Sequence, residues 1–237
     1  MALPKEKSSK VTSLSEQIIM IYGRPKIGKS TLCSCFPNAI FLATEPGLKG
    51  LDVFKVNCTK WTEFLTACKE IKEGQHEFKT VIIDTVDKML DLIQRHVCEE
   101  EKVDSIGDIP HGRGYTASRN ILSQTLDKLA GLPYGLVLVS HCQTMKIETA
   151  TAMYNRWTIT CGAERDNQIA MDLMDIILFM DSKIKDGKEI GVVHTKPSMN
   201  FDAGDKSKLL PIEIEFPLDN PSVAYKVIAE RFSNGSR

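Results

Sequence analysis

The sequence lacks the features of several classes of protein. Its 237 residues contain no apolar run long enough to span a membrane, and residues 1–15 are polar, without the apolar core of a signal peptide. The formal net charge is −1, so bulk charge gives little attraction for polyanions. Neither internal repeats nor low-complexity segments are present. We therefore expect no membrane partner, a flexible tail at residues 1–15 and one domain at residues 16–237.

Cysteine pairs are missing as well. The seven cysteines are scattered along the chain without a C-x-x-C pair, which argues against a zinc site and against a disulfide framework. Buried free thiols in a reducing cytoplasm fit this pattern better.

One motif stands out among the features that are present. Residues 23–30 read G-R-P-K-I-G-K-S, the phosphate-binding pattern G-x-x-x-x-G-K-[ST]. A short apolar run at residues 17–22 precedes the motif, and residues 29–36 can form a helix that Pro37 ends. Strand, glycine-rich turn and helix start thus follow one another in the order that a phosphate loop requires.

The residue types in this loop match the chemistry of a nucleoside triphosphate. Gly23 and Gly28 let the backbone turn so that amide N–H groups face phosphate oxygens, and the helix start adds the positive end of its dipole. We expect Lys29 to reach the β- and γ-phosphates and Ser30 to ligate Mg²⁺. With ATP and Mg²⁺ as cofactors, the predicted nucleotide-binding residues are Gly23, Arg24, Pro25, Lys26, Ile27, Gly28, Lys29, Ser30 and Thr31.

Apolar periodicity along the rest of the chain predicts alternating strands and helices. Strands are expected at residues 17–22, 39–43, 53–56, 80–84, 136–140, 176–180 and 212–216, and helices at residues 29–36, 61–73, 85–101, 115–130 and 164–174. Residues 143–160 suit a hairpin or a mobile arm. This order predicts an α/β P-loop fold whose mostly parallel central sheet is flanked by helices, with antiparallel strands toward the C-terminus.

Polar side chains follow three of the predicted strands, at the edge where parallel sheets bind ligands. Asp84 closes T-V-I-I-D and is the candidate second Mg²⁺ ligand, although aspartate also suits the cap of the next helix. Glu45 follows the strand at residues 39–43, where it is either a general base or a solvated turn residue. His141 follows L-V-L-V-S and either contacts the γ-phosphate or is an ordinary residue at a strand end.

The order of these motifs resembles the core of RecA- and RadA-type recombination ATPases. The chain reads strand–G-x-x-x-x-G-K-S, strand–T-E-P-G, strand–I-I-D-T and strand–S-H. It is more similar still to compact RecA-like proteins of bacteriophages, some of which anneal single-stranded DNA. That resemblance implies catalytic roles for Lys29, for Glu45 as general base and for His141 as sensor of the γ-phosphate, where RecA itself has glutamine. It also implies a DNA-stimulated ATPase of recombination or single-strand annealing, working as a homo-oligomeric ring or filament in the cytoplasm of a bacterial host.

Further roles follow from the resemblance alone. In RecA-type assemblies basic residues of one subunit contact the γ-phosphate held by the next, and the candidates here are Lys196, Lys206 and Lys208. The DNA-binding loops of that family correspond to residues 105–119 and 146–165. Basic and aromatic side chains suit stacking on single strands, and the candidates are Arg113, Tyr115, Arg119 and Arg156. Solvated turns or ordinary packing are the alternatives for each.

Other functions stay open at the level of sequence. A small-molecule kinase could use the same loop, but the eight arginines are dispersed rather than gathered in a lid. A GTPase switch would need an N-K-x-D motif, which the chain lacks. A nucleotide-binding assembly protein with little turnover would need only the loop.

Overall fold

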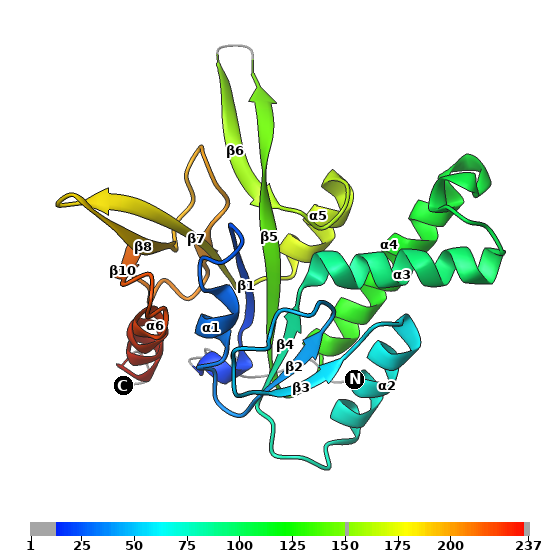
Figure 1. The fold of residues 1–237 in the computed structure, drawn as a ribbon, viewed down its shortest axis with the longest axis horizontal. Coiled ribbons are helices and arrows are strands. Elements are labelled where there is room, and N and C mark those ends of the chain that lie inside the picture. The colour runs from blue at the N-terminus through cyan, green and yellow to red at the C-terminus, as the bar shows by residue number, and fades with distance from the viewer. Residues whose placement is uncertain (1–12, 150–151, 235–237) are drawn as a thin grey trace, which may run out of the picture.

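A computed structural model describes residues 13–149 and 152–234 (Figure 1). In these residues ten strands form a sheet in the order β10-β8-β7-β1-β5-β4-β2-β3, with β6 paired to β5 and β9 paired to β7. The strands are β1 (Ile18–Gly23), β2 (Ala39–Ala43), β3 (Phe54–Asn57), β4 (Thr80–Asp84), β5 (Gly135–Glu148), β6 (Met153–Ile159), β7 (Ile176–Lys185), β8 (Lys188–His194), β9 (Gly204–Asp205) and β10 (Glu213–Phe216). The α-helices are α1 (Lys29–Cys33), α2 (Trp61–Glu73), α3 (Val86–Glu101), α4 (Arg113–Ala130), α5 (Glu164–Asp172) and α6 (Ser222–Asn234), and the 3-10 helices are η1 (Leu14–Glu16), η2 (Ile106–Asp108) and η3 (Pro110–Gly112).

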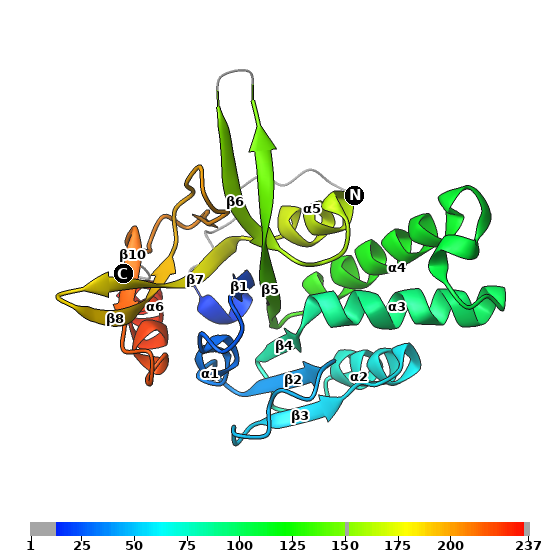
Figure 2. The ribbon, with the colours of Figure 1, turned by 45° about the horizontal axis from the view of Figure 1, so that its top comes forward.

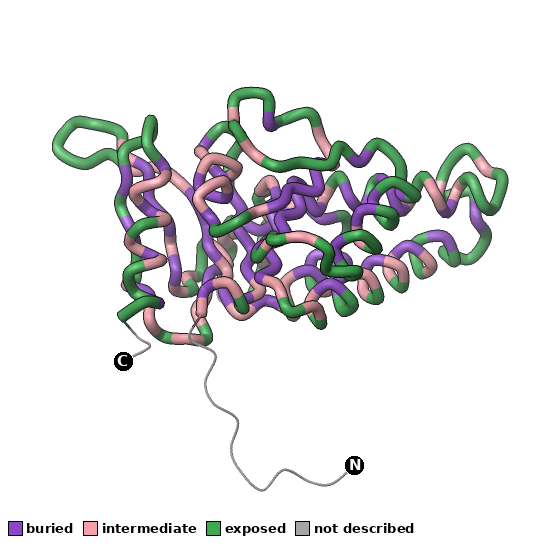
Figure 3. Tube along the Cα trace, turned by 90° about the horizontal axis from the view of Figure 1, so that it is seen from below, coloured by how far each residue is buried: buried purple, intermediate pink, exposed green. Residues whose placement is uncertain are grey.

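Helices cover both faces of the sheet (Figure 2), because alternate residues of a strand point to opposite sides. On β4, Val81 and Ile83 pack in one hydrophobic cluster with α2, α3, α4 and α5. Ile82 packs in a second cluster with α1 and α6. The central strands are therefore buried on both sides (Figure 3), which explains why their sequences read as continuous apolar runs.

The strand order decides which segments meet at the carboxyl edge of the sheet. The strands β1, β5, β4 and β2 are neighbours and run parallel, with Gly23 opposite His141 and Asp84 opposite both Ala43 and Val139. Four segments that are far apart in the sequence therefore leave the sheet side by side at this edge.

Two parts of the chain extend beyond the sheet. The far half of β5 pairs antiparallel with β6, and the resulting hairpin projects from the molecule (Figure 1). The helices α3 and α4 project in a different direction, with η2 and η3 between them. The hairpin expected at residues 143–160 is confirmed.

The predicted α/β fold, with parallel core and antiparallel strands β8 and β10, is confirmed, but some elements differ from expectation. The helix α1 ends at Cys33, because the N–H groups of Cys35 and Phe36 bond three residues back and tighten the chain into turns. No helix was predicted at α6. A flexible tail is predicted at residues 1–15, but Leu14 and Ser15 belong to η1 and Leu14 is buried; residues 1–12 lie outside the described chain. Within the described segments, none of the helices combines the length and the hydropathy needed to cross a bilayer.

Candidate active site

The phosphate loop lies between β1 and α1 at the carboxyl edge. Gly28 has a φ of +99°, which favours glycine, and a Cβ added there would lie 2.3 Å from Pro221 Cγ, just before α6. A Cβ on Gly23 would lie 2.3 Å from the carbonyl oxygen of Met180 on β7. Both glycines are therefore required by close contacts, and the unpredicted helix α6 closes one side of the loop.

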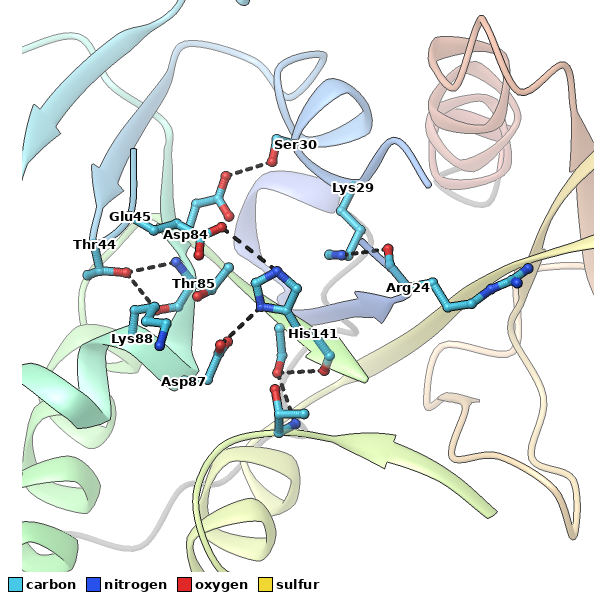
Figure 4. A network of polar contacts seen from close by, with 12 residues as sticks. Arg24, Lys29, Ser30, Thr44, Glu45, Asp84, Thr85, Asp87, Lys88 and His141 are labelled. Carbon is cyan, nitrogen blue, oxygen red and sulfur yellow. Dashed lines mark hydrogen bonds and ion pairs between the residues drawn. The ribbon is translucent and has the colours of Figure 1, made fainter. Parts of the chain in front are cut away.

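Arg24, the second residue of the loop, directs its side chain away from Lys29 (Figure 4). The Arg24 guanidinium donates hydrogen bonds to Asp181 Oδ1 and Ser182 Oγ, both at 2.7 Å, on β7. In this structure the Arg24 side chain therefore links the loop to β7. The other loop residues include exposed Pro25 and Lys26, buried Ile27 and half-buried Thr31.

Lys29 is held over the loop by backbone carbonyls. Its Nζ donates to the carbonyl oxygens of Gly23 at 2.9 Å and Arg24 at 3.0 Å, and the residue is only 7% exposed. Burial lowers the pKa of Lys29, while nearby acidic groups oppose that shift. The ammonium is therefore placed at the loop, where phosphate oxygens can replace the carbonyls as its partners.

Ser30 and Asp84 meet at the edge of the sheet. Ser30 Oγ donates to Asp84 Oδ2 at 2.7 Å. Burial raises the pKa of Asp84, and the hydrogen bond from Ser30 and the charge of Lys29 oppose this. Mg²⁺ is commonly bound by one or two carboxylates together with substrate phosphates, so this hydroxyl and carboxylate fit the ion. Nowhere among the described residues do three or more histidine, cysteine or acidic side chains gather to hold a metal; Mg²⁺ usually completes its shell with water and substrate phosphate oxygens.

His141 lies between two carboxylates (Figure 4). Its Nδ1 is 3.0 Å from Asp87 Oδ2, and its Nε2 is 3.9 Å from Glu45 Oε1. The hydrogen bond with Asp87 raises the pKa of His141. Burial opposes ionisation of Asp87, but the hydrogen bond and charge of His141 outweigh it and lower the pKa of Asp87. Burial raises the pKa of Glu45, an effect that the charge of His141 opposes.

The loop and these side chains border a cleft of about 510 Å³. Small-molecule sites commonly have volumes of about 300–1,000 Å³, so a nucleotide fits by size. The residues that line the cleft are Pro25, Lys26, Gly28, Lys29, Ser30, Thr31, Glu45, Gly47, Gly50, Leu51, Asp84, Thr85 and His141. The structure thus brings together the predicted catalytic and metal-binding side chains of the chain's own site.

Asp87 was not predicted. The signal lies in the sequence D-T-V-D, in which the second aspartate follows Asp84 by three residues. Because Val86 begins α3, Asp87 falls in the first helical turn, directly above the carboxyl edge of β4.

The three lysines expected to act on a neighbouring subunit lie away from the chain's own cleft. Lys206 Nζ is 3.6 Å from Asp175 Oδ1, and Asp175 directly precedes β7, at the amino end of that strand. Lys196 Nζ is 3.6 Å from Asp205 Oδ2 on β9, which pairs with the same end of β7. Lys208 is exposed nearby in the sequence.

The residues expected to contact DNA are spread over two parts of the molecule. Arg113 and Tyr115 are exposed at the start of α4. Arg119, one turn further, pairs with Asp166 of α5 at 3.0 Å. Arg156 lies on the hairpin and pairs with Asp202. The start of α4 and the hairpin project in different directions, so the structure does not gather these four side chains (Figures 1 and 2).

Residues 15–207 match AAA_24, a family described as an AAA domain. The chain belongs to this family of P-loop ATPase domains. Family membership agrees with the loop, the strand order and the polar carboxyl edge, and it implies nucleotide binding.

Comparisons of sequence and of structure each find similar proteins. The SPbeta prophage-derived uncharacterized protein YorG of Bacillus subtilis (strain 168) is 24% identical over 177 residues, which cover 71% of this chain and 52% of YorG. The chain therefore spans about half the length of this relative. Two solved structures are each 10% identical: the flagellar accessory protein FlaH from Methanocaldococcus jannaschii (TM-score 0.48, 86% of this chain and 85% of that one) and the KaiC-like protein PH0186 from Pyrococcus horikoshii OT3 (TM-score 0.42, 76% and 78%).

Proposed function

We propose that this AAA-domain protein binds ATP with Mg²⁺ in the cleft and hydrolyses it. One observation carries the proposal: residues at the carboxyl ends of β1, β2 and β4, and at the point where β5 leaves the parallel sheet, converge on one cleft. They are Lys29, Ser30, Glu45, Asp84 and His141.

Each side chain has a role that its position supports. Lys29 and the loop amides bind the β- and γ-phosphates. Ser30 and Asp84 would hold Mg²⁺, which supplies positive charge against the phosphate oxygens. Water attacks the γ-phosphorus, the bond to the ADP oxygen breaks, and Glu45 takes the proton of the water. Burial that raises the pKa of Glu45 makes it a stronger base for this step.

We further propose that the enzyme works on single-stranded DNA as a homo-oligomer, in recombination or annealing. In such an oligomer Lys196 and Lys206 would have to reach the γ-phosphate of a neighbour, because both lie at the amino end of β7, opposite their own phosphate loop. The hairpin supports the DNA partner, since it projects from the molecule and carries half-buried Tyr154 and Arg156, whereas Trp157 packs against the core at its base. A prophage-derived relative supports a bacteriophage origin, and with it the cytoplasm of a bacterial host.

Release of γ-phosphate tests the central proposal. Wild type and Lys29→Ala are incubated with labelled ATP, with Mg²⁺ or with a chelator, and with or without an oligonucleotide. Release that needs Mg²⁺ and Lys29 supports hydrolysis, and stimulation by the oligonucleotide supports the DNA partner. Transfer of label to an added nucleoside or nucleoside monophosphate would support a kinase instead. Tight ATP binding with no release under all conditions would leave an assembly protein with little turnover.

A second experiment tests the oligomer and the DNA partner. We expect ATP to increase the sedimentation coefficient and oligonucleotide anisotropy to fall steeply with salt, because neutralised phosphates release counterions. Lys196→Ala and Lys206→Ala should lower turnover without weakening ATP binding, whereas Lys69→Ala on the exposed side of α2 should change neither. A protein that stays monomeric in ATP and gives no anisotropy change at low salt would refute both parts.

A further inference from the structure

We propose that Asp87 is a positioning residue for His141, fixing the imidazole so that Nε2 faces the space between Glu45 and the γ-phosphate. This inference rests on the proposed ATPase function and assigns a residue that neither the motif nor the family match singles out. It follows from where Asp87 stands, from what it contacts and from what it does not contact.

The sheet places Asp87 beside His141. The strand β4 lies between β5 and β2, with Asp84 opposite Val139 on one side and Ala43 on the other. His141 stands two residues beyond Val139 and therefore reaches past the end of β4, where the first turn of α3 begins. There the carboxylate of Asp87 meets Nδ1 at 3.0 Å.

The contact fixes which nitrogen donates. An ionised carboxylate only accepts hydrogen bonds, so Nδ1 of His141 must carry the proton that it donates to Asp87. The other ring nitrogen is then turned toward Glu45 Oε1, 3.9 Å away, and His141 lines the cleft. Nε2 can donate to a γ-phosphate only when it also carries a proton, so the useful form is the imidazolium, which the carboxylate of Asp87 stabilises through Nδ1–H. Without Asp87 the ring could rotate or lose its charge, and its hydrogen bond to the γ-phosphate would be lost.

Asp87 is itself firmly placed. Its side chain is 12% exposed, and it stands in the first turn of α3, where the helix dipole favours an anion. Thr85, two residues before Asp87, is hydrogen-bonded to Thr44, which directly follows β2. The Thr85 N–H donates to Thr44 Oγ1 at 2.8 Å, and that hydroxyl donates to Thr85 O at 2.7 Å. Because Thr44 is adjacent to Glu45, these two hydrogen bonds hold the start of α3 and the segment of Glu45 in fixed positions relative to each other (Figure 4).

Asp87 does not act as a second metal ligand in this arrangement. The Ser30 hydroxyl bonds to Asp84, and Asp87 is not among the residues that line the cleft. Its hydrogen-bonded link to the cleft is therefore through His141, while its charge also adds to the raised pKa of Glu45 and opposes the burial that lowers the pKa of Lys29.

Substitution of Asp87 tests this role. Asp87→Asn keeps the size of the side chain, but its neutral amide no longer stabilises the imidazolium, and its NH2 can donate to an unprotonated Nδ1. We expect kcat to fall about 10- to 100-fold, the usual range for a misplaced participant in proton transfer and charge stabilisation, while the Kd of a non-hydrolysable ATP analogue changes less than about twofold. Asp91→Asn is the matched control: one turn along α3, Asp91 pairs with exposed Lys88 and should leave kcat unchanged.

A double-mutant cycle shows whether Asp87 acts through His141. In the His141→Gln background, Asp87→Asn should cost less than about twofold further, because the group that it positions is gone. Long-range nitrogen–proton correlation on histidine-labelled protein gives a readout that needs no turnover; the signal missing in His141→Gln assigns this ring among the five histidines. We expect a protonated Nδ1 in the wild type and loss of that signature in Asp87→Asn, with folding checked by circular dichroism.

The outcomes separate this inference from the proposed function. If the wild type releases no phosphate, the ATPase proposal fails and the spectrum alone decides the role of Asp87. If wild type turns over ATP and Asp87→Asn behaves like Asp91→Asn, the inference is overturned. Multiplicative losses in the double variant, or an unprotonated Nδ1 in wild type, would overturn it equally.

Discussion

Replacing Arg119 by methionine separates a structural role from a role in DNA binding. Arg119 Nε donates to Asp166 Oδ1 at 3.0 Å, with 24% of the arginine side chain and 5% of the aspartate side chain exposed. Methionine keeps much of the apolar stem but removes the charge. Asp166 then stays in place as a buried carboxylate with one remaining donor, the N–H of Ala163 at 2.9 Å.

The size of the effect follows from that burial. Breaking a fully buried ion pair by removing one partner costs about 3–5 kcal/mol. Arg119 is about a quarter exposed and Asp166 keeps one hydrogen bond, so water and the backbone reduce the cost and we expect about 2–3 kcal/mol. For a chain of this size each kcal/mol lowers Tm by about 2–4 °C, which gives a loss of about 4–12 °C.

Calorimetry and urea unfolding measure the loss, with Arg113→Met on the exposed start of the same helix as control. The control should change the free energy of unfolding by less than about 0.5 kcal/mol. Replacing Asp166 as well, by leucine, should recover part of the loss because no unpaired charge is then buried. If Arg119→Met melts within 1 °C of wild type (roughly the reproducibility of the method) but loses oligonucleotide binding, Arg119 is a DNA contact and the structural account is wrong.

Three further predictions concern the cleft. Lys29→Ala should weaken ATP binding about 10- to 100-fold by calorimetric titration, since a hydrogen bond to a charged group contributes about 1.5–3 kcal/mol; an affinity within twofold of wild type would contradict the loop assignment. Glu45→Gln should keep ATP binding and lose about 10²- to 10⁴-fold in turnover, because an amide cannot accept the proton of water; normal turnover would make Glu45 a turn residue. The stability that Asp87 and His141 give each other should be lost at both ends of the pH range. The raised pKa of His141 keeps its share full below about pH 6.5, and this share is lost as pH rises through the folded-state value. The lowered pKa of Asp87 keeps its share full above about pH 4, and this share is lost as pH falls through the folded-state value. Urea unfolding of wild type against Asp87→Asn should therefore differ most between about pH 4 and 6.5, and a difference independent of pH would refute the pairing.

Where sequence reasoning fell short, the missing information lay in packing. The helix α6 has apolar residues four apart, Ala224, Ile228 and Phe232, a spacing typical of a helix face, but these residues become part of a core only by packing against α1 and β10. Arg119 and Arg156 look like free cations in the sequence. Each pairs with an aspartate more than forty residues away, Asp166 and Asp202, and such pairs are invisible until the chain is folded.

The sequence by itself determined the phosphate loop and the parallel sheet, because both depend on local chemistry: glycines that allow a tight turn, a lysine and a serine at fixed spacing, and apolar runs that can be buried only from two sides. It also predicted that Asp84, Glu45 and His141 end strands at a ligand-binding edge; all three lie at that edge, although β5 continues past His141 to Glu148 as one arm of the hairpin. Only the tertiary structure decided that β4 lies between β2 and β5. That order brings the first turn of α3 against His141 and makes Asp87 its partner, because hydrogen bonds between distant segments depend on which strands are neighbours and not on which residues are close in the chain.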